Sequence, residues 1–309
     1  MTDTTTLEPM APQPAPEPAP AEVKGRSLWD DAKRRLLANP AAVASLYVVG
    51  VLVLLAAFGP MLWVHEVDAI FRDEVGVAPT LQNWHWLGTD TEGRDMVARL
   101  LFGLRISLLV GVAATAVALT IGVVYGAVAG FIGGAVDEVM MRFVDVLYAI
   151  PFIFFVIVLM TVVHTEDPIS NLLLIFMAIG AVEWLTMSRI VRGQTISLRR
   201  KEFVEAARAS GASSMQIVFR HIVPNVLGPV VVFATLNIPV IILAESFLSF
   251  IGLGVKEPLT SLGALISRGV AQQQAPWMLI APAVTMLITL LALNFLGDGL
   301  RDALDPKER

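Results

Sequence analysis

Few side chains in this sequence could carry out chemistry. The 309-residue chain has no cysteine, so it offers no thiolate nucleophile and no cysteine metal site. Its histidines fall in loops between apolar stretches, and no Gly-x4-Gly-Lys-Ser/Thr motif is present to hold a nucleotide phosphate. We therefore predict no catalytic residue, no metal ligand and no bound cofactor in this chain. The four histidines are His65, His85, His164 and His221.

Three polar side chains lie inside long apolar stretches, where charge is costly and often functional. At a rise of about 1.5 Å per residue, Glu183 lies roughly 16 Å deep and Asn237 roughly 18 Å, both near the middle of a bilayer. Glu245, at roughly 30 Å, should reach the outer interface, where it is cheap to solvate. We interpret all three as candidates for a translocation pathway. A buried ion pair or a water-filled crevice would explain Glu183 equally, and a hydrogen bond to a neighbouring helix would explain Asn237.

The most informative pattern lies in a basic loop, 189–223, which contains seven Lys or Arg residues. The segment 198–210 favours helix throughout, and Gly211 suits a left-handed C-terminal cap. Ser213 and Gln216 have the spacing of a capping box that opens a second helix. The loop is therefore predicted to be a helix-turn-helix.

The first helix of this loop presents a narrow face that could lie in the groove of a soluble partner. Residues three and four positions apart share one side of a helix, and small side chains allow close approach while an aromatic ring anchors the contact. We predict that this helix couples the chain to a partner that supplies force. The coupling residues are Phe203, Glu205, Ala206, Ala207 and Gly211, and Ser210 completes the face.

The elements that must position these residues are membrane-spanning helices. Hydrophobic residues make up 56% of the chain and the mean hydropathy is +0.71, and six stretches supply the roughly 20 apolar residues that a spanning helix needs. Sixteen Lys and Arg residues lie on the side that the termini share and six on the other, which predicts that both termini are cytoplasmic. The expected spans are 41–63, 106–131, 145–163, 171–188, 225–247 and 277–297.

Small residues recur at every fourth position along the second span. Without a hydrophobic drive between helices in lipid, such faces mark close helix packing. The sequence leaves open whether the packed helix belongs to this chain or to a partner. The stripe consists of Ala114, Ala118, Gly122, Gly126, Gly130 and Gly134, of which Gly122, Gly126 and Gly130 are the central packing positions.

The ends of the chain differ in composition from the middle, 41–297, which contains the six spans. Residues 1–25 hold six prolines and are expected to be a disordered cytoplasmic tail. The pattern of residues 26–40 predicts an interfacial amphipathic helix. This helix could be a positively charged anchor that sets the topology, or it could dock to a partner. The first apolar stretch is too long for a signal peptide, so the span should stay attached. Residues 298–309 are expected to be a cytoplasmic tail.

The loop between the first two spans, 64–105, is the external segment most expected to be ordered. We predict a capped turn leading into a helix parallel to the membrane, with Asp90 and Asp95 as caps and with Arg99 and Arg105 at the lipid headgroups. Trp84, Trp86 and Arg94 also lie in this loop. An interface belt of tryptophans and contact with a protein outside the membrane are the alternatives.

The basic loop resembles the EAA loop of permease subunits of bacterial ABC importers. Glu205-Ala206-Ala207, then Gly211, then an apolar pair before Pro224 match that motif, whereas His221 and Val223 depart from its usual Ile-x-Leu-Pro ending. Further blocks resemble the peptide and nickel branch of the family, and most of all the "C" subunits of oligopeptide permeases. They span Arg26–Trp29, Leu87–Asp90, Gly93–Asp95, Arg105–Ser107, Glu245–Gly254 with Pro258, and Gly297–Pro306.

The resemblance implies an all-α type I permease in a bacterial cytoplasmic membrane, with a cytoplasmic coupling helix. It further implies a homologous "B" permease, two ATPase subunits that bind ATP and magnesium, a periplasmic or lipid-anchored binding protein, and a peptide substrate. Nickel-complex and glutathione importers share the same blocks and stay open as alternatives.

Other classes of protein fit the sequence less well. An ion-driven secondary transporter generally shows inverted repeats and ionisable clusters at the midplane, but we find no convincing repeat. A membrane-embedded hydrolase would need a nucleophile and a base within the bilayer, and Ser246 beside Glu245 lacks a third partner. The net charge of −5 gives no indication of nucleic-acid binding.

Overall fold

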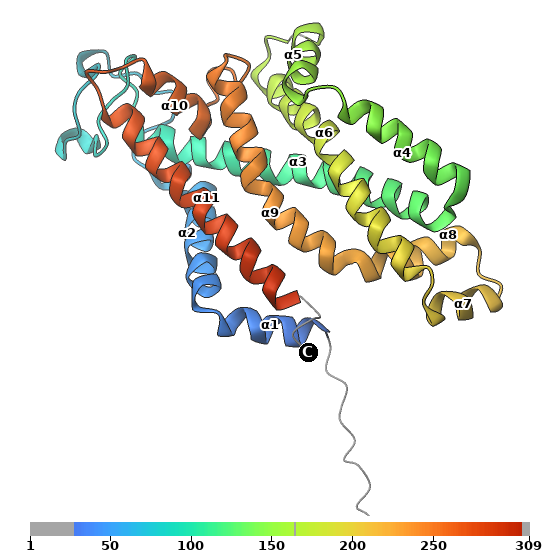
Figure 1. Ribbon diagram of the computed structural model, residues 1–309. Coiled ribbons are helices and arrows are strands. Elements are labelled where there is room, and N and C mark those ends of the chain that lie inside the picture. Colours follow the sequence, from blue (N-terminus) through green and yellow to red (C-terminus); the bar gives the residue numbers. More distant parts are fainter. Residues whose placement is uncertain (1–27, 164, 305–309) are drawn as a thin grey trace, which may run out of the picture.

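The computed structural model describes residues 28–163 and 165–304, and this part of the chain is built from helices (Figure 1). The predicted tail 1–25 lies outside the described residues, as do residues 305–309. The helices are α1 (Leu28–Ala38), α2 (Pro40–Leu62), η1 (Arg72–Glu74), η2 (Gln82–Trp84), α3 (Met96–Ile132), α4 (Gly134–Tyr148), α5 (Phe152–Val162), α6 (Pro168–Leu198), α7 (Glu202–Ala209), α8 (Ser214–Ile217), η3 (Val218–Ile222, a π-helix), α9 (Val223–Phe250), α10 (Leu262–Val270) and α11 (Trp277–Leu304).

Five helices of the described chain are long and apolar enough to cross a membrane: α2, α3, α6, α11 and the continuous segment Ser214–Phe250. A sixth crossing arises if α4 and α5, which meet at a bend of 80°, are counted as one broken span. The prediction of one regular helix over 145–163 is therefore wrong. Pro151, at the N-cap of α5, lacks the N–H that a continuous helix would need there.

Three other elements differ from the expectation. The predicted membrane-parallel helix before the second span does not exist as a separate element, because α3 runs unbroken from Met96. The chain after α9 contains α10, which the sequence did not predict. The sixth span is longer than expected, since α11 continues to Leu304 into the predicted tail. The helix predicted over 26–40 is present as α1, and its position at the membrane interface stays a prediction.

The small residues of α3 pack against α6 of the same chain, which answers the question that the sequence left open. An added Cβ at Gly122 would lie 2.6 Å from Met187 Cβ, and one at Gly130 would lie 2.8 Å from the Arg192 carbonyl oxygen. At Gly126 the added atom would overlap the Ser188 carbonyl. Glycine is required here because the two backbones are in contact.

Gly134 does not belong to this stripe. It begins α4 with a φ of +58° and has open space around its Cα.

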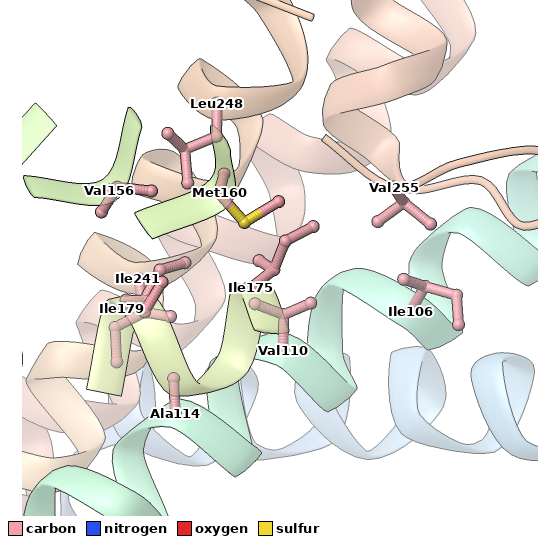
Figure 2. Close-up of a cluster of buried hydrophobic side chains, with 11 residues drawn as sticks. Ile106, Val110, Ala114, Val156, Met160, Ile175, Ile179, Ile241, Leu248 and Val255 are labelled. Atoms are coloured by element: carbon pink, nitrogen blue, oxygen red, sulfur yellow. The ribbon is translucent and has the colours of Figure 1, made fainter. Parts of the chain in front are cut away.

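A buried apolar cluster ties four helices together near the N-terminal half of α3 (Figure 2). Side chains from α3, α5, α6 and α9 meet there, and Val255 joins from the segment after α9. Packing of this kind fixes how the bent α4–α5 pair lies against α6 and α9. The labelled members are Ile106, Val110, Ala114, Val156, Met160, Ile175, Ile179, Ile241, Leu248 and Val255.

Arg105 of α3 compensates for a proline in α2. Pro60 has no N–H, so the carbonyl of Ala56 lacks its usual donor four residues later. Arg105 Nε donates to that carbonyl oxygen at 2.7 Å, and Arg105 Nη2 donates to Ala57 O at 2.8 Å. The arginine thus satisfies α2 backbone, and its placement at the headgroups stays a prediction.

The two ends of the bundle carry different elements. In Figure 1, α1, α7 and the C-terminal end of α11 lie toward one end, and the loop 64–95 and α10 lie toward the other. Close packing supports the first grouping, because an added Cβ at Gly299 of α11 would contact Ala42 of α2 and Leu36 of α1. The loop that contains α7 and the loop before α3 are therefore on opposite sides.

Candidate functional site

The candidate site is the loop that joins α6 to α9 and contains α7. The prediction of an unbroken helix over 198–210 is wrong, since α6 ends at Leu198 and α7 begins at Glu202. Lys201 between them is extended. Helix propensity is overridden here by tertiary packing, because the turn lets α7 lie against the end of α3.

The predicted turn after α7 is confirmed in detail. Gly211 has a φ of +82°, its N–H donates to Arg208 O, and the N–H of Ala212 donates to Ala207 O, which is the Schellman pattern. Ser213 and Gln216 form the capping box at the start of α8. Helix, turn and helix are therefore held in a defined geometry by backbone bonds.

The inner side of the loop is fixed to the C-terminal end of α3. Val204, Ile217 and Ile222 are buried and share a cluster with Phe131 of α3. The Arg208 guanidinium lies 5.2 Å from the centre of the Phe131 ring, an arrangement that favours a cation–π contact. Both helices of the loop are therefore anchored to the end of α3.

Arg199 strengthens this attachment by capping α3. Its Nη1 donates to Gly130 O at 3.3 Å and to Phe131 O at 3.2 Å. The last carbonyls of a helix lack intrahelical donors and carry partial negative charge, so an arginine is favourable there.

The outer side of the loop exposes large apolar groups. Phe203 is 38% exposed, and Met215 and Phe219, which the sequence did not single out, are 50% and 53% exposed. Their spacing of four residues along one helix was the available signal. Met215 and Phe219 lie near the start of the continuous helix Ser214–Phe250, ahead of the span 225–247 that the sequence predicts. Exposed apolar groups at such a position are typical of a surface that a partner covers.

The structure divides the coupling face that the sequence predicted. Glu205, Ala206 and Ser210 are exposed like Phe203, whereas Ala207 is half-buried and packs toward the α3 cluster. Glu205 lies in the first turn of α7, where a carboxylate is favoured by the helix dipole.

Two of the three polar residues inside the spans contact each other. Asn237 Nδ2 of α9 donates to Glu183 Oε2 of α6 at 3.1 Å. The hydrogen bond to a neighbouring helix that we considered for Asn237 is thus present. Because α6 enters the α7 loop and α9 leaves it, this contact joins the two spans attached to the loop.

Glu245 is fully buried, so the expectation that it is cheaply solvated at the interface is wrong. Its Oε1 accepts hydrogen bonds from Ser249 and Ser261, each at 2.7 Å. Ser261 also caps α10 through the N–H of Ala264. Glu245 therefore fixes α10 to α9, because the segment after α9 folds back over a position that the linear sequence places near solvent.

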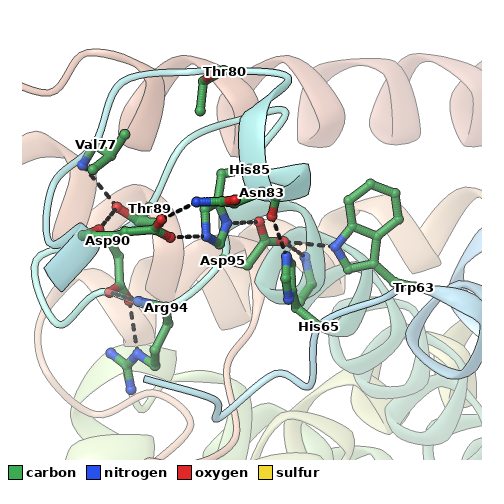
Figure 3. Close-up of polar contacts among 12 residues, drawn as sticks. Trp63, His65, Val77, Thr80, Asn83, His85, Thr89, Asp90, Arg94 and Asp95 are labelled. Carbon is green, nitrogen blue, oxygen red and sulfur yellow. Dashed lines mark hydrogen bonds and ion pairs between the residues drawn. The ribbon is translucent and has the colours of Figure 1, made fainter. Parts of the chain in front are cut away.

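On the other side of the bundle, the loop before α3 is ordered by buried charges (Figure 3). Asp95 caps α3, as predicted, by accepting from the N–H of Ala98 at 2.8 Å. Asp90 caps a turn instead of a helix, since it accepts from the N–H groups of Glu92 and Arg94 at 2.8 and 2.9 Å.

The prediction that Arg99 reaches the headgroups is wrong, because its side chain is 1% exposed and pairs with Glu257 at 3.3 Å. Burial raises the pKa of Glu257, but the charges of Arg99, Arg268 and Arg94 outweigh burial and leave the pKa below its usual value. Burial lowers the pKa of Arg94, but its hydrogen bond to Asp90 and the nearby carboxylates raise it above the usual value.

The chain belongs to the family of binding-protein-dependent transport system inner membrane components, whose sequence model matches residues 122–309. A second model, the N-terminal transmembrane domain of oligopeptide transport permease C, matches residues 27–79. The chain is thus a multi-pass membrane permease.

Among its relatives, the oligopeptide transport system permease protein OppC of Escherichia coli K12 is 54% identical over 93% of this chain and 94% of that protein. The OppC protein of Haemophilus influenzae is 50% identical over 93% of this chain and 91% of its own length. The dipeptide transport system permease protein DppC of Bacillus subtilis is 41% identical over 92% and 87%.

Proposed function

We propose that this chain is the permease subunit of an ATP-driven importer that moves oligopeptides across a bacterial cytoplasmic membrane. The observation that carries the proposal is the α7 loop, whose outer side exposes Phe203, Met215 and Phe219 while its inner side is anchored to α3. Identities of 50% and 54% to two oligopeptide permeases support the cargo.

In this proposal the chain crosses the membrane six times, with α4 and α5 together as the third crossing. Both termini and the α7 loop then lie in the cytoplasm, in keeping with the bias of Lys and Arg residues. A second, homologous permease completes the pathway, and an external binding protein delivers peptide to the side that carries the loop 64–95.

Two ATPase subunits bind ATP and magnesium and hydrolyse the nucleotide, and this chain itself binds neither. Closure of the ATPases moves α7, and the attached α6 and α9 carry the displacement into the bundle. Coupling of this kind requires that α7 contact the ATPases differently in two states. Glu183, Asn237 and Glu245 stay candidates for the pathway that responds.

The coupling role is tested by Glu205→Lys and Gly211→Asp in the reconstituted importer. Glu205→Lys reverses charge in the first turn of α7, and Gly211→Asp places a side chain at a φ of +82°, where a side chain is strained. We expect peptide uptake and binding-protein-stimulated ATP hydrolysis to fall together by about 10-fold or more, on the order of 1.4 kcal/mol.

Glu138→Lys is the matched control, because Glu138 is an exposed carboxylate of α4 outside the α7 loop. It should leave both activities near the wild-type level. Assembly of every variant is verified by co-purification of the ATPases. Wild-type uptake and ATP hydrolysis in an assembled Glu205→Lys complex would refute the coupling role.

The cargo is tested separately, by competition between peptides of different length. The identity to a dipeptide permease makes dipeptides the second candidate cargo. If excess unlabelled dipeptide does not reduce the uptake of a labelled pentapeptide, the result would support oligopeptide import. Uptake of dipeptides alone would contradict it and leave the coupling role intact.

A further inference from the structure

A cluster of metal-ligating side chains lies in the loop before α3, on the side of the bundle opposite to α7. One ligand atom from each of His65, His85 and Asp95 lies within 4.8 Å of the other two. The three residues come from separate elements: His65 follows the end of α2, His85 follows η2, and Asp95 caps α3 (Figure 3). Twenty residues separate the two histidines, so no short motif reveals the cluster.

Neighbouring groups orient the ligand atoms of His85 and Asp95 as the outer partners of metal sites do. His85 Nε2 lies 2.6 Å from Glu74 Oε2, which leaves His85 Nδ1 to face Asp95 Oδ2 at 2.8 Å. A carboxylate on the far ring nitrogen is the usual partner of a metal-binding histidine. Asp95 Oδ1 accepts from Trp63 Nε1 at 2.8 Å, so Oδ2 is the oxygen available to an ion.

The cluster is buried but reachable. His85 and Asp95 are 1% and 0% exposed, while His65 is half-exposed. A cavity of about 440 Å³ borders His65, Glu74 and His85, which gives an ion a route from solvent. Since His65 Nε2 lies 2.8 Å from the carbonyl oxygen of Asn83, turning its ring exchanges a hydrogen bond for a metal–nitrogen bond.

We propose that His65, His85 and Asp95 bind a divalent transition-metal ion, with Glu74 orienting His85. Two imidazoles and a carboxylate suit Zn²⁺ in tetrahedral geometry, with water as the fourth ligand. Ligand atoms at about 2.0–2.1 Å from the ion lie roughly 3.3 Å apart. On metal binding, His85 Nδ1 and Asp95 Oδ2, now 2.8 Å apart, therefore move slightly away from each other, and the His65 ring moves toward them.

The bound ion joins the end of α2 to the start of α3 and closes the loop between them. The site belongs to this chain alone and does not depend on coupling to ATPases. Its occupancy is therefore measured without any transport assay.

The test uses the full chain in nanodiscs, purified with a streptavidin-binding tag in place of a polyhistidine tag. Zn²⁺ affinity is measured against a chromophoric chelator, and Co²⁺ is added to record the visible absorption of a tetrahedral site. We expect one Zn²⁺ per chain in the wild type. His65→Ala should weaken binding by more than the roughly 10- to 100-fold expected for loss of an outer partner, and Glu74→Gln by about that amount.

Two variants separate ligation from folding. His65→Cys supplies a thiolate ligand and should restore binding that His65→Ala loses. His221→Ala removes a histidine from the opposite side of the bundle and should bind Zn²⁺ as the wild type does. His65 is chosen because its loss leaves the bonds of His85 with Glu74 and Asp95 in place.

Failure of the wild-type chain to bind Zn²⁺ would overturn the proposal, and so would wild-type affinity in His65→Ala. In either case the cluster would be a hydrogen-bonded group of His85 with Glu74 and Asp95 and nothing more. Binding that His65→Ala abolishes and His65→Cys restores would establish the site.

Discussion

At the scale of single residues, several charged side chains serve the backbone or each other. Arg105 supplies the hydrogen bond that Pro60 removes from Ala56. Arg199 donates hydrogen bonds to the final carbonyls of α3. Glu245 accepts a hydrogen bond from the hydroxyl of Ser261, the residue that caps α10. In an apolar environment an unsatisfied carbonyl or carboxylate is costly. Each of these contacts therefore stabilises the helix whose polar group it satisfies.

Arg105 supplies the hydrogen bond to Ala56 O that Pro60 cannot make. The effects of substitutions at Arg105 and Pro60 on stability should therefore be non-additive. Arg105→Leu leaves the Ala56 carbonyl without a donor and should lower the free energy of unfolding by about 1–3 kcal/mol. In the Pro60→Ala background the new N–H can bond to that carbonyl, so the same substitution should cost less. Unfolding of the four proteins in detergent forms the double-mutant cycle. Equal losses in both backgrounds would show that Arg105 does not compensate for the proline.

The lowered pKa of Glu257 predicts how stability depends on pH. A carboxylate with a lower pKa in the folded chain holds fewer protons there than in the unfolded chain, so it contributes stability above its ordinary value of 4.5. That contribution is lost as the pH falls through the lowered folded value. Glu257→Gln should reduce the loss of stability between about pH 6 and pH 3. The measurement is the unfolding midpoint of both proteins across this range, and parallel curves would contradict the prediction.

At the scale of elements, the contact of α3 with α6 brings the backbones of two long helices together. The backbones approach at Gly122, Gly126 and Gly130, where an added Cβ would meet α6. Phe131 and Ala127 then carry the same helix into the cluster beneath α7. The glycine face thus positions the helix that holds the coupling loop.

Two glycine-to-alanine substitutions separate this packing from helix propensity. Gly126→Ala should lower stability by about 1–3 kcal/mol, since the new methyl group overlaps α6 backbone. Gly193→Ala is the matched control in α6, where no atom lies within 4 Å of the new Cβ, and it should be neutral or stabilising by about 0.5–1 kcal/mol. Thermal unfolding of the purified proteins distinguishes the two. A Gly126→Ala protein as stable as the control would contradict the prediction, because it would show that α3 and α6 accommodate the methyl group without loss of stability.

At the scale of the whole molecule, the α7 loop connects to the interior through α6 and α9. The hydrogen bond between Asn237 and Glu183 joins these spans. In the mechanism proposed above, motion of α7 changes the surroundings of a carboxyl group inside the bundle. This link between an external loop and an internal polar pair is what a coupled transporter needs.

Breaking that pair should uncouple transport from ATP hydrolysis. Asn237→Leu removes the donor to Glu183, and we expect fewer peptides imported per ATP hydrolysed, on the order of 10-fold fewer, which corresponds to about 1.4 kcal/mol. Glu183→Gln should change uptake in the same direction. Both rates are measured in proteoliposomes, with Thr120→Val as control, because Thr120 bonds within its own helix to Ala116. Unchanged ratios in both variants would remove Glu183 and Asn237 from the pathway.

The sequence by itself determined the elements that follow from local rules. Long apolar stretches predicted the spans, and Gly211 with Ser213 and Gln216 predicted the turn after α7, because caps depend on neighbouring residues alone. The blocks around Glu205 placed the chain in its family. The small-residue stripe of α3 predicted a close packing face without naming the helix that fills it.

Only the tertiary structure decided which distant groups meet. The burial of Glu245 depends on α10 folding back from the following segment, and that of Arg99 depends on Glu257 far along the chain. The inward turn of Ala207 depends on the end of α3, and the approach of His65 to His85 and Asp95 depends on the loop before that helix. Caps and spans arise from residues within a few positions of each other, whereas solvation and partnership of a polar group are set by whatever the folded chain brings beside it.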